Sequence, residues 1–143
     1  MKFLKKSFIN RVLMFSLLIV FCGCSNRPTD IEVLNLVKPG GFVLQKEIFK
    51  KGSSQKNRGT KVFSYSVSIK YIRPGLTYGY VSECPEAQCC KDVEIEKKTE
   101  YLIGKNQWNE WEIFESRTLE ENEVREIWRP SSTTQEEFYK DYK

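Results

Sequence analysis

The sequence predicts a mainly β protein: a small antiparallel β-sandwich or open barrel with short helical segments at the termini. The strongest observation is in residues 63–71, where aromatic and β-branched residues alternate with serines and one lysine. A period of two gives a strand one buried and one hydrated face, as is common in antiparallel sheets. Turn-forming residues bound this segment: the Gly- and Ser-containing run 50–61 precedes it, and Arg73-Pro74-Gly75 follows it.

The other strands are predicted from shorter signals. Residues 42–49 are predicted to form a strand, and 76–82 begin the next one after the Pro-Gly turn. Further strand-like runs are the alternating segment 92–96 and the stretches 101–103 and 108–118. About six strands with few helices are typical of a small antiparallel β-domain.

Three segments carry helical or ambiguous signals. Thr29 and Glu32 have the spacing of a capping box, so residues 30–37 form either a short helix or an extended lead-in. Residues 119–129 suit either a helix or a hairpin with a glutamate-rich turn, and the strands predicted on both sides favour the hairpin. The polar tail 131–143 predicts a frayed helical end.

The first 24 residues have the layout of a cleaved secretory signal. Residues 2–11 include four basic residues and no acidic one, residues 12–21 are apolar apart from Ser16, and small residues follow. This apolar run is shorter than the roughly 20 residues that a membrane-spanning helix needs. A retained N-terminal anchor helix is the alternative, but small residues at the expected cleavage position favour removal.

Residues 21–26, Phe-Cys-Gly-Cys-Ser-Asn, resemble the lipobox of bacterial lipoproteins. In that family a small residue precedes a cysteine that is acylated through its sulfur and becomes the first residue after cleavage. Gly23 before Cys24 fits this pattern, whereas lipidation of Cys22 would place bulky Phe21 at the cleavage position. The resemblance implies a diacylglyceryl group with palmitate-type chains on Cys24, and two or more chains hold a protein stably on a membrane.

The residue after Cys24 indicates a destination. Ser25, in place of aspartate, resembles the sorting pattern of Gram-negative outer-membrane lipoproteins, which implies a domain facing the periplasm. The inner membrane and exposure at the cell surface are the alternatives. The expected organisation is a cleaved signal peptide at 1–23, a tether at 24–30, one β-rich domain at 31–130 and a polar tail at 131–143.

The formal net charge of +4 belongs to the signal peptide. Four of the 23 basic residues lie in residues 1–23, which leaves 19 basic and 19 acidic residues in the mature chain. A neutral mature chain gives no support to a nucleic-acid function. The densest basic run, 50–61, predicts an exposed loop that contacts anionic lipid headgroups or another polyanion, although a solvated hairpin loop is the favoured interpretation. Its candidate contact residues are Lys50, Lys51, Lys56 and Arg58.

Three cysteines lie in the mature domain, at Cys84, Cys89 and Cys90. In an oxidising periplasm two of them should pair, and the sequence allows any of the three pairings. The remaining thiol would stay free or form an intermolecular bond. A catalytic thiol would need a base, and the chain has no histidine. A zinc site would need a fourth ligand and Cys-x-x-Cys spacing, so a structural disulfide is favoured.

Tryptophans and glutamates are the remaining candidates. Trp108 and Trp111 point to opposite faces of a regular strand, so an exposed one would stack on a sugar ring or an interface. Core packing is favoured, because a domain this small needs most of its aromatic residues inside. Seven glutamates between 110 and 126 are too many for any one pair to indicate a glycosidase. We expect no enzyme activity, metal site or cofactor.

The sequence therefore predicts a non-catalytic, lipid-anchored envelope protein that acts as an interaction or assembly component at the periplasmic face of the outer membrane. Its expected partners are the membrane, through the acyl chains, and another envelope protein. The basic loop and the spare thiol are the expected contact features. The alternative is a module that binds peptidoglycan or another envelope sugar through exposed tryptophans.

Overall fold

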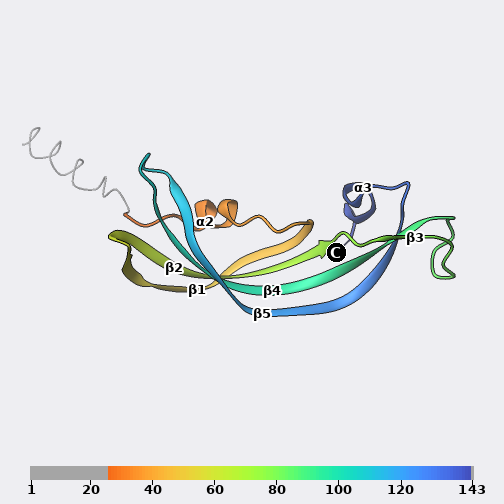
Figure 1. Cartoon of the computed structure of the whole chain (residues 1–143), viewed down its shortest axis with the longest axis horizontal. Helices are drawn as coiled ribbons and strands as arrows, with labels where there is room; N and C mark the ends of the chain where they lie inside the picture. Colours follow the sequence, from red (N-terminus) through yellow and green to blue (C-terminus); the bar gives the residue numbers. More distant parts are fainter. Residues whose placement is uncertain (1–25, 143) are drawn as a thin grey trace, which may run out of the picture.

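The computed structural model describes residues 26–142, which form one open five-stranded antiparallel sheet and two short helices (Figure 1). The elements are α2 (Asp30–Leu36), β1 (Phe42–Asn57), β2 (Thr60–Arg73), β3 (Thr77–Tyr78), β4 (Cys89–Lys105), β5 (Trp111–Pro130) and α3 (Gln135–Tyr139). β2 lies between β1 and β4, and β4 also pairs with β5 and β3. The predicted mainly β class with short helices near both ends is confirmed. The predicted signal peptide, Cys22 and Cys24 lie outside the described residues.

The molecule is elongated because its strands are long (Figure 1). β4 has 17 residues, which at about 3.3 Å per residue corresponds to roughly 50 Å. The β1–β2 turn (57–60) and the β4–β5 turn (106–110) lie at the end where the N-terminal segment joins the domain. We call this the N-terminal end. β3 and the loop 79–88 lie at the opposite end, which we call the distal end.

The core lies on one face of the sheet, under α2. Every second residue of β2 faces it, and the five side chains predicted to be buried are at most 8% exposed. These residues are Phe63, Tyr65, Val67, Ile69 and Tyr71. Val33 and Val37 complete this core, and both are almost fully buried. The α2 helix is fixed at its start by the predicted capping box, in which Thr29 and Glu32 satisfy each other's free groups.

The predicted basic loop 50–61 is wrong. β1 continues to Asn57, and only Arg58 and Gly59 form the connection, both with positive φ (47° and 84°). Such a two-residue turn matches the twist of a hairpin. The strand has a loop-like composition because β1 is an edge strand that buries little surface, and lysines on an edge discourage pairing with other chains. Irregular pairing between Lys51 and Ser54 adds a bulge there.

The segment 119–129 is neither a helix nor a hairpin, so both interpretations are wrong. β5 runs unbroken from Trp111 to Pro130 along β4. Its glutamates face lysines on β4: Lys97 lies 2.8 Å from Glu121, and Lys98 lies 2.7 Å from Glu120. Opposite charges across neighbouring strands stabilise the pairing without an apolar alternation. The predicted strand 76–82 is also shorter than expected, because only Thr77–Tyr78 pair with β4.

The polar tail contains a short helix, as predicted, and this helix packs against the sheet. Thr134 and Glu137 form a second capping box, which starts α3. The ring of Tyr139 is fully buried and lies 5.8 Å from that of Phe42, measured between centroids. Phe42 pairs with Ile72. Neighbouring side chains of a strand point to opposite faces, so Ile72 points away from the face that α2 covers. α3 therefore packs on the face of the sheet opposite α2.

Candidate functional site

The chain that enters the domain is fastened to the N-terminal end by Arg27. Its guanidinium donates from Nε to the Tyr65 hydroxyl and from Nη2 to the Gly52 carbonyl, both at 2.9 Å. The same group stacks over the rings of Phe63 and Tyr65, 5.4 and 5.0 Å from their centroids. The Tyr65 hydroxyl in turn donates to the carbonyl of Pro28 at 2.9 Å. The last residues of the predicted tether are therefore held against β1 and β2.

The two turns of the N-terminal end meet beside Asn26. Asn26 lines a hollow of about 310 Å³ together with side chains from both turns and strands, and a neighbouring hollow carries Trp108. The residues lining the first hollow are Asn26, Thr60, Lys61, Phe63, Lys105 and Trp111. Asn106 shapes the β4–β5 turn, because its side-chain oxygen accepts from the backbone N–H groups of Trp108 and Glu110 at 3.0 Å.

The two candidate tryptophans have different environments. Trp111 is half-buried and packs edge-on against Phe63, with ring centroids 6.3 Å apart, while the ammonium group of Lys105 lies 5.1 Å from its ring. Trp108, at the β4–β5 turn, is 71% exposed. The favoured interpretation, core packing, is therefore correct for Trp111 and wrong for Trp108. Trp108 offers a flat apolar group to whatever lies beyond this end of the sheet.

The four basic candidates divide into two pairs. Lys56 and Arg58 are exposed at the β1–β2 turn. Lys51 forms an ion pair with Asp30 of α2 at 2.7 Å, and Lys50 lines a separate hollow on the sheet. Only Lys56 and Arg58 of these four therefore belong to the N-terminal end. Lys61, the last residue of the predicted basic run, and Lys105, which the sequence did not indicate, join them there.

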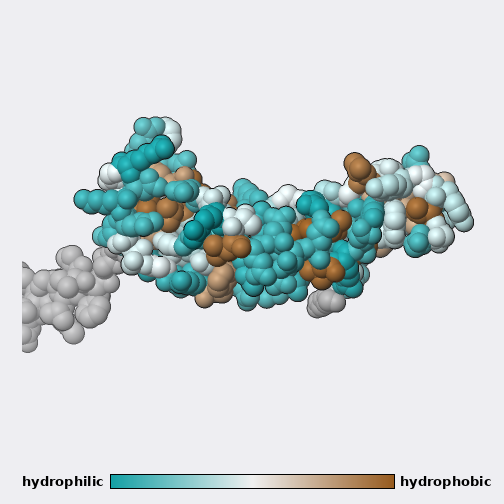
Figure 2. Space-filling view, turned by 60° about the horizontal axis from the view of Figure 1, so that its bottom comes forward, coloured by the Kyte–Doolittle hydropathy of each residue, from teal (hydrophilic) through white to brown (hydrophobic). Residues whose placement is uncertain are grey.

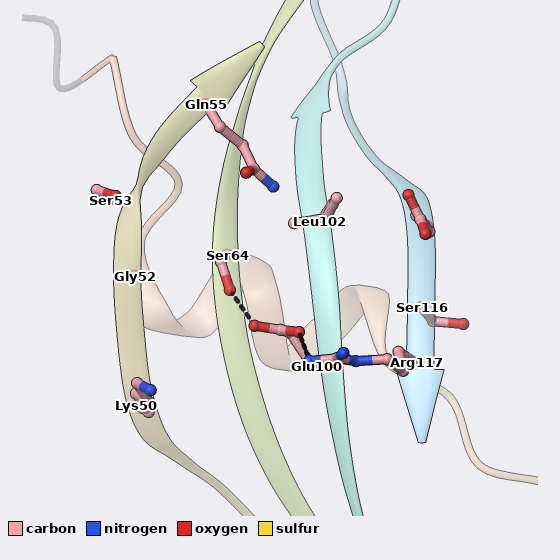
Figure 3. Close-up of a pocket in the computed structure, with 10 residues that line it drawn as sticks. Lys50, Gly52, Ser53, Gln55, Ser64, Glu100, Leu102, Ser116 and Arg117 are labelled. Atoms are coloured by element: carbon pink, nitrogen blue, oxygen red, sulfur yellow. Dashed lines mark hydrogen bonds and ion pairs between the residues drawn. The ribbon is translucent and has the colours of Figure 1, made fainter. Parts of the chain in front are cut away.

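The separate hollow lies on the sheet face opposite α2, and we call it the polar hollow (Figure 3). Its volume is about 500 Å³, and Glu100 of β4 lines it between Ser64 and Arg117 (Figure 3). The Ser64 hydroxyl donates to Glu100 at 2.9 Å, and Arg117 donates to its other oxygen at 2.8 Å. The hydrogen bond from Ser64 and the charge of Arg117 hold the pKa of Glu100 below its usual value.

This arrangement does not fit acid–base or nucleophilic chemistry. Glu100 is kept ionised by its two donors, so it is a poor proton donor at neutral pH. The Ser64 hydroxyl donates a hydrogen bond to a carboxylate that also binds Arg117, and the sequence provides no histidine that could act as a base. Within residues 26–142, no group of three or more potential ligand side chains could hold a metal ion.

The cysteine cluster lies at the distal end. Cys84 and Cys89 form a disulfide, one of the three pairings that the sequence allowed. Cys90 has a free thiol that is only 8% exposed, with its sulfur 3.5 Å from the Thr77 hydroxyl. Cys90 pairs with Thr77 of β3 and Arg129 of β5, so the spare thiol, predicted as a contact feature, is buried in the folded domain. Next to this cluster, Leu76 and Tyr80 are 75% and 83% exposed.

A buried polar network, which the sequence analysis missed, joins the distal half of the sheet to α3. Asp92 of β4 accepts hydrogen bonds from Arg129, Tyr139, Gln135 and the backbone N–H of Gly75. Burial acts to raise the pKa of Asp92, but these donors outweigh it and leave the pKa lowered. Burial, and then the bond to Asp92, raise the pKa of Tyr139. The network is closed to solvent, so its role is structural.

Comparisons with protein-family models, curated proteins and solved structures found no match. Of the helices formed by residues 26–142, neither is long and apolar enough to cross a membrane. The candidate site of this protein is therefore its N-terminal end, with exposed Trp108 and the basic residues of both turns.

Proposed function

We propose that this protein is a non-catalytic, lipid-anchored component of a bacterial cell envelope, held by acyl chains on Cys24 at the periplasmic face of the outer membrane. The observation that carries the proposal is the fastening of Arg27 to Tyr65 and Gly52. A residue three positions after the predicted lipid-bearing cysteine is part of the folded domain. The anchor is thus coupled to one end of an elongated sheet.

The distal end supports a role in assembly with another envelope protein. Leu76, Tyr78 and Tyr80 are exposed there, and exposed aromatic residues are common at protein interfaces. Figure 2 shows small hydrophobic areas, drawn in brown, at this end of the molecule. The Cys84–Cys89 disulfide constrains the adjacent loop and suits an oxidising compartment such as the periplasm. A partner bound there would sit roughly 50 Å from the anchor, the length of β4.

A glycan-binding module is the second candidate, and the exposure of Trp108 favours it. A sugar ring stacked on the indole would quench its fluorescence. Titration with soluble peptidoglycan fragments separates the two functions. The assembly role predicts unchanged emission, and saturable quenching that disappears in Trp108→Phe would establish the glycan role.

The intact mass of the membrane-extracted protein tests the anchor. After alkylation in denaturant without reduction, we expect a chain that starts at Cys24, carries acyl chains and has one alkylated thiol, that of Cys90. Cys24→Ala should abolish acylation, and the matched variant Cys22→Ala should leave it intact. A chain that starts at Met1, or three alkylated cysteines in the domain, would contradict the envelope proposal.

Photo-crosslinking tests the distal contact. A photoreactive residue in place of Tyr80 should capture one defined envelope protein in living cells. The same residue in place of Glu47, exposed on β1, is the matched control and should not capture it. Equal capture at both positions, or none at Tyr80, would contradict the distal interface.

A further inference from the structure

We infer that the N-terminal end itself rests on the membrane that holds the anchor, with its basic residues on anionic lipid headgroups and Trp108 at the headgroup level. This inference rests on the proposed acylation of Cys24 and deepens it. It assigns a lipid-binding surface to the two turns, and it fixes how the domain stands on the membrane.

Chain length places this end at the membrane surface. Asn26 lies between the two turns, and Cys24 precedes it by two residues. Two extended residues span at most about 7 Å. Arg27 prevents the domain from moving away on a longer tether, because it fastens the chain directly after Asn26. The lipid-bearing residue therefore lies within about 7 Å of Asn26, which lines the same hollow as Thr60, Lys61 and Lys105.

The charges at this end suit an anionic surface. Four basic residues belong to the two turns and their flanks: Lys56, Arg58, Lys61 and Lys105. All four are exposed, and none takes part in the ion pairs formed within residues 26–142. Elsewhere on the sheet, bases of the β4–β5 pairing are paired with glutamates. Bases without an ion pair are available to headgroup phosphates, although the ammonium groups of Lys61 and Lys105 also lie over the rings of Phe63 and Trp111.

Two acidic residues, Glu110 and Glu112, flank the β4–β5 turn. Glu32 of α2 is also near this end, because its hydrogen bonds to Thr29 and the charge of Lys105 lower its pKa. These three carboxylates offset part of the basic charge. The four bases still exceed them, whereas the mature chain as a whole is neutral. The remainder of the domain is therefore slightly acidic, and an anionic membrane repels it while attracting the turns. The molecule's charge asymmetry favours an orientation with the N-terminal end down and the distal end away from the lipid.

Trp108 supplies the apolar part of the contact. It is 71% exposed, and Asn106 holds its backbone within the turn. Tryptophan prefers the membrane–water interface, because its ring is apolar and its N–H needs a polar partner. Neither a soluble glycan nor a protein partner accounts for the basic residues and the nearby Cys24 together, whereas an anionic lipid surface accounts for both.

Quenching by brominated lipids tests this contact on the full acylated protein in vesicles. We compare vesicles of phosphatidylcholine with vesicles that also contain phosphatidylglycerol, both brominated near the headgroup end of the acyl chains. We expect quenching of tryptophan fluorescence that increases with phosphatidylglycerol and decreases with salt. Trp108→Phe should remove most of it. The matched variant Trp128→Phe, near the distal end, should lose the same amount of emission to the brominated lipid as the wild type does.

A charge variant tests the basic residues separately. Lys56→Gln combined with Lys105→Gln, which leaves Arg58 and Lys61 in place, should weaken the dependence on phosphatidylglycerol while the protein stays anchored. The matched control is Lys38→Gln combined with Lys140→Gln, exposed lysines outside the two turns. Acylated protein whose Trp108 is not quenched, or is quenched only by glycan fragments, would overturn this inference alone. A mass without acyl chains would overturn the proposed anchor together with it.

Discussion

Arg129 donates from Nε to Asp92 at 2.8 Å, and the two side chains are 9% and 0% exposed. The pair joins β5 to β4, and the Tyr139 hydroxyl adds a 2.9 Å hydrogen bond from α3 to the same carboxylate. An ionised carboxylate inside a protein is tolerated when donors surround it. These contacts connect α3, β5 and the central strand β4.

Asp92→Asn should destabilise the fold by about 3–5 kcal/mol, since it leaves the buried guanidinium of Arg129 without a negative partner. The free energy of unfolding in urea measures this loss. Glu96→Gln, a similar change on a half-buried residue of the same strand, is the control and should cost well under 1 kcal/mol. A loss below 1 kcal/mol in Asp92→Asn would show that the pair does not hold the elements together.

Acid should weaken the wild type through the same group. Because the pKa of Asp92 is lower in the folded state, its contribution is present above the unfolded pKa of about 3.9. That contribution is lost as pH falls further. The stability of Asp92→Asn should therefore fall less steeply below pH of about 4 than that of the wild type. Parallel curves for the two proteins would contradict this assignment.

Local signals in the sequence predicted the elements that depend on local chemistry. The alternation in 63–71 produced a buried strand face, and the spacing of Thr29 and Glu32 produced a capped helix. The edge strands were harder, because 50–57 and 119–130 lie at the borders of an open sheet and bury few side chains. Without a buried face they show no period of two, and in 119–130 ion pairs with lysines of β4 replace the apolar signal.

The candidate site could likewise be predicted only in part. Trp108, Lys56 and Arg58 were identified from composition alone, and the structure brings them to one end. Arg27 was placed in a tether, because its partners Tyr65 and Gly52 lie 38 and 25 residues away. The Asp92–Arg129 contact spans 37 residues. Pairings at that separation depend on strand register, which bulges in β1 and β5 shift by amounts that no local pattern encodes.

Tyr139→Phe should cost about 1 kcal/mol at neutral pH, because it removes the hydrogen bond to Asp92 and keeps the ring. Because the pKa of Tyr139 is raised in the folded wild type, its contribution to stability is present below the unfolded pKa of about 10. That contribution is lost as pH rises further. The variant should therefore lose less stability between pH of about 9 and 11. Tyr80→Phe, at an exposed tyrosine, is the control and should lose as much stability over this range as the wild type. An equal loss in Tyr139→Phe would contradict the prediction.

Cys90 should resist labelling in the folded protein, since its side chain is buried beside Thr77. We expect a maleimide to modify it at least tenfold more slowly in buffer than in urea, as followed by intact mass without reductant. Tyr80→Cys provides an exposed thiol at the same end as the control, and it should react at once. Rapid labelling of Cys90 in buffer would show that β3 separates from β4, and the thiol would then be available to a partner after all.

Arg27→Ala should free the segment between the anchor and the domain. It removes two hydrogen bonds and the stacking on Phe63 and Tyr65, so we expect a loss of about 1–3 kcal/mol in the free energy of unfolding. Hydrogen–deuterium exchange of the peptide covering residues 26–36 should become faster in the full chain. Arg27→Lys keeps the charge but lacks the planar fork that makes both bonds, so it should resemble Arg27→Ala. Lys38→Ala should change neither quantity. If Arg27→Lys retained wild-type exchange, charge alone would hold the segment, and the hydrogen bonds to Tyr65 and Gly52 would not be what couples the anchor to the sheet.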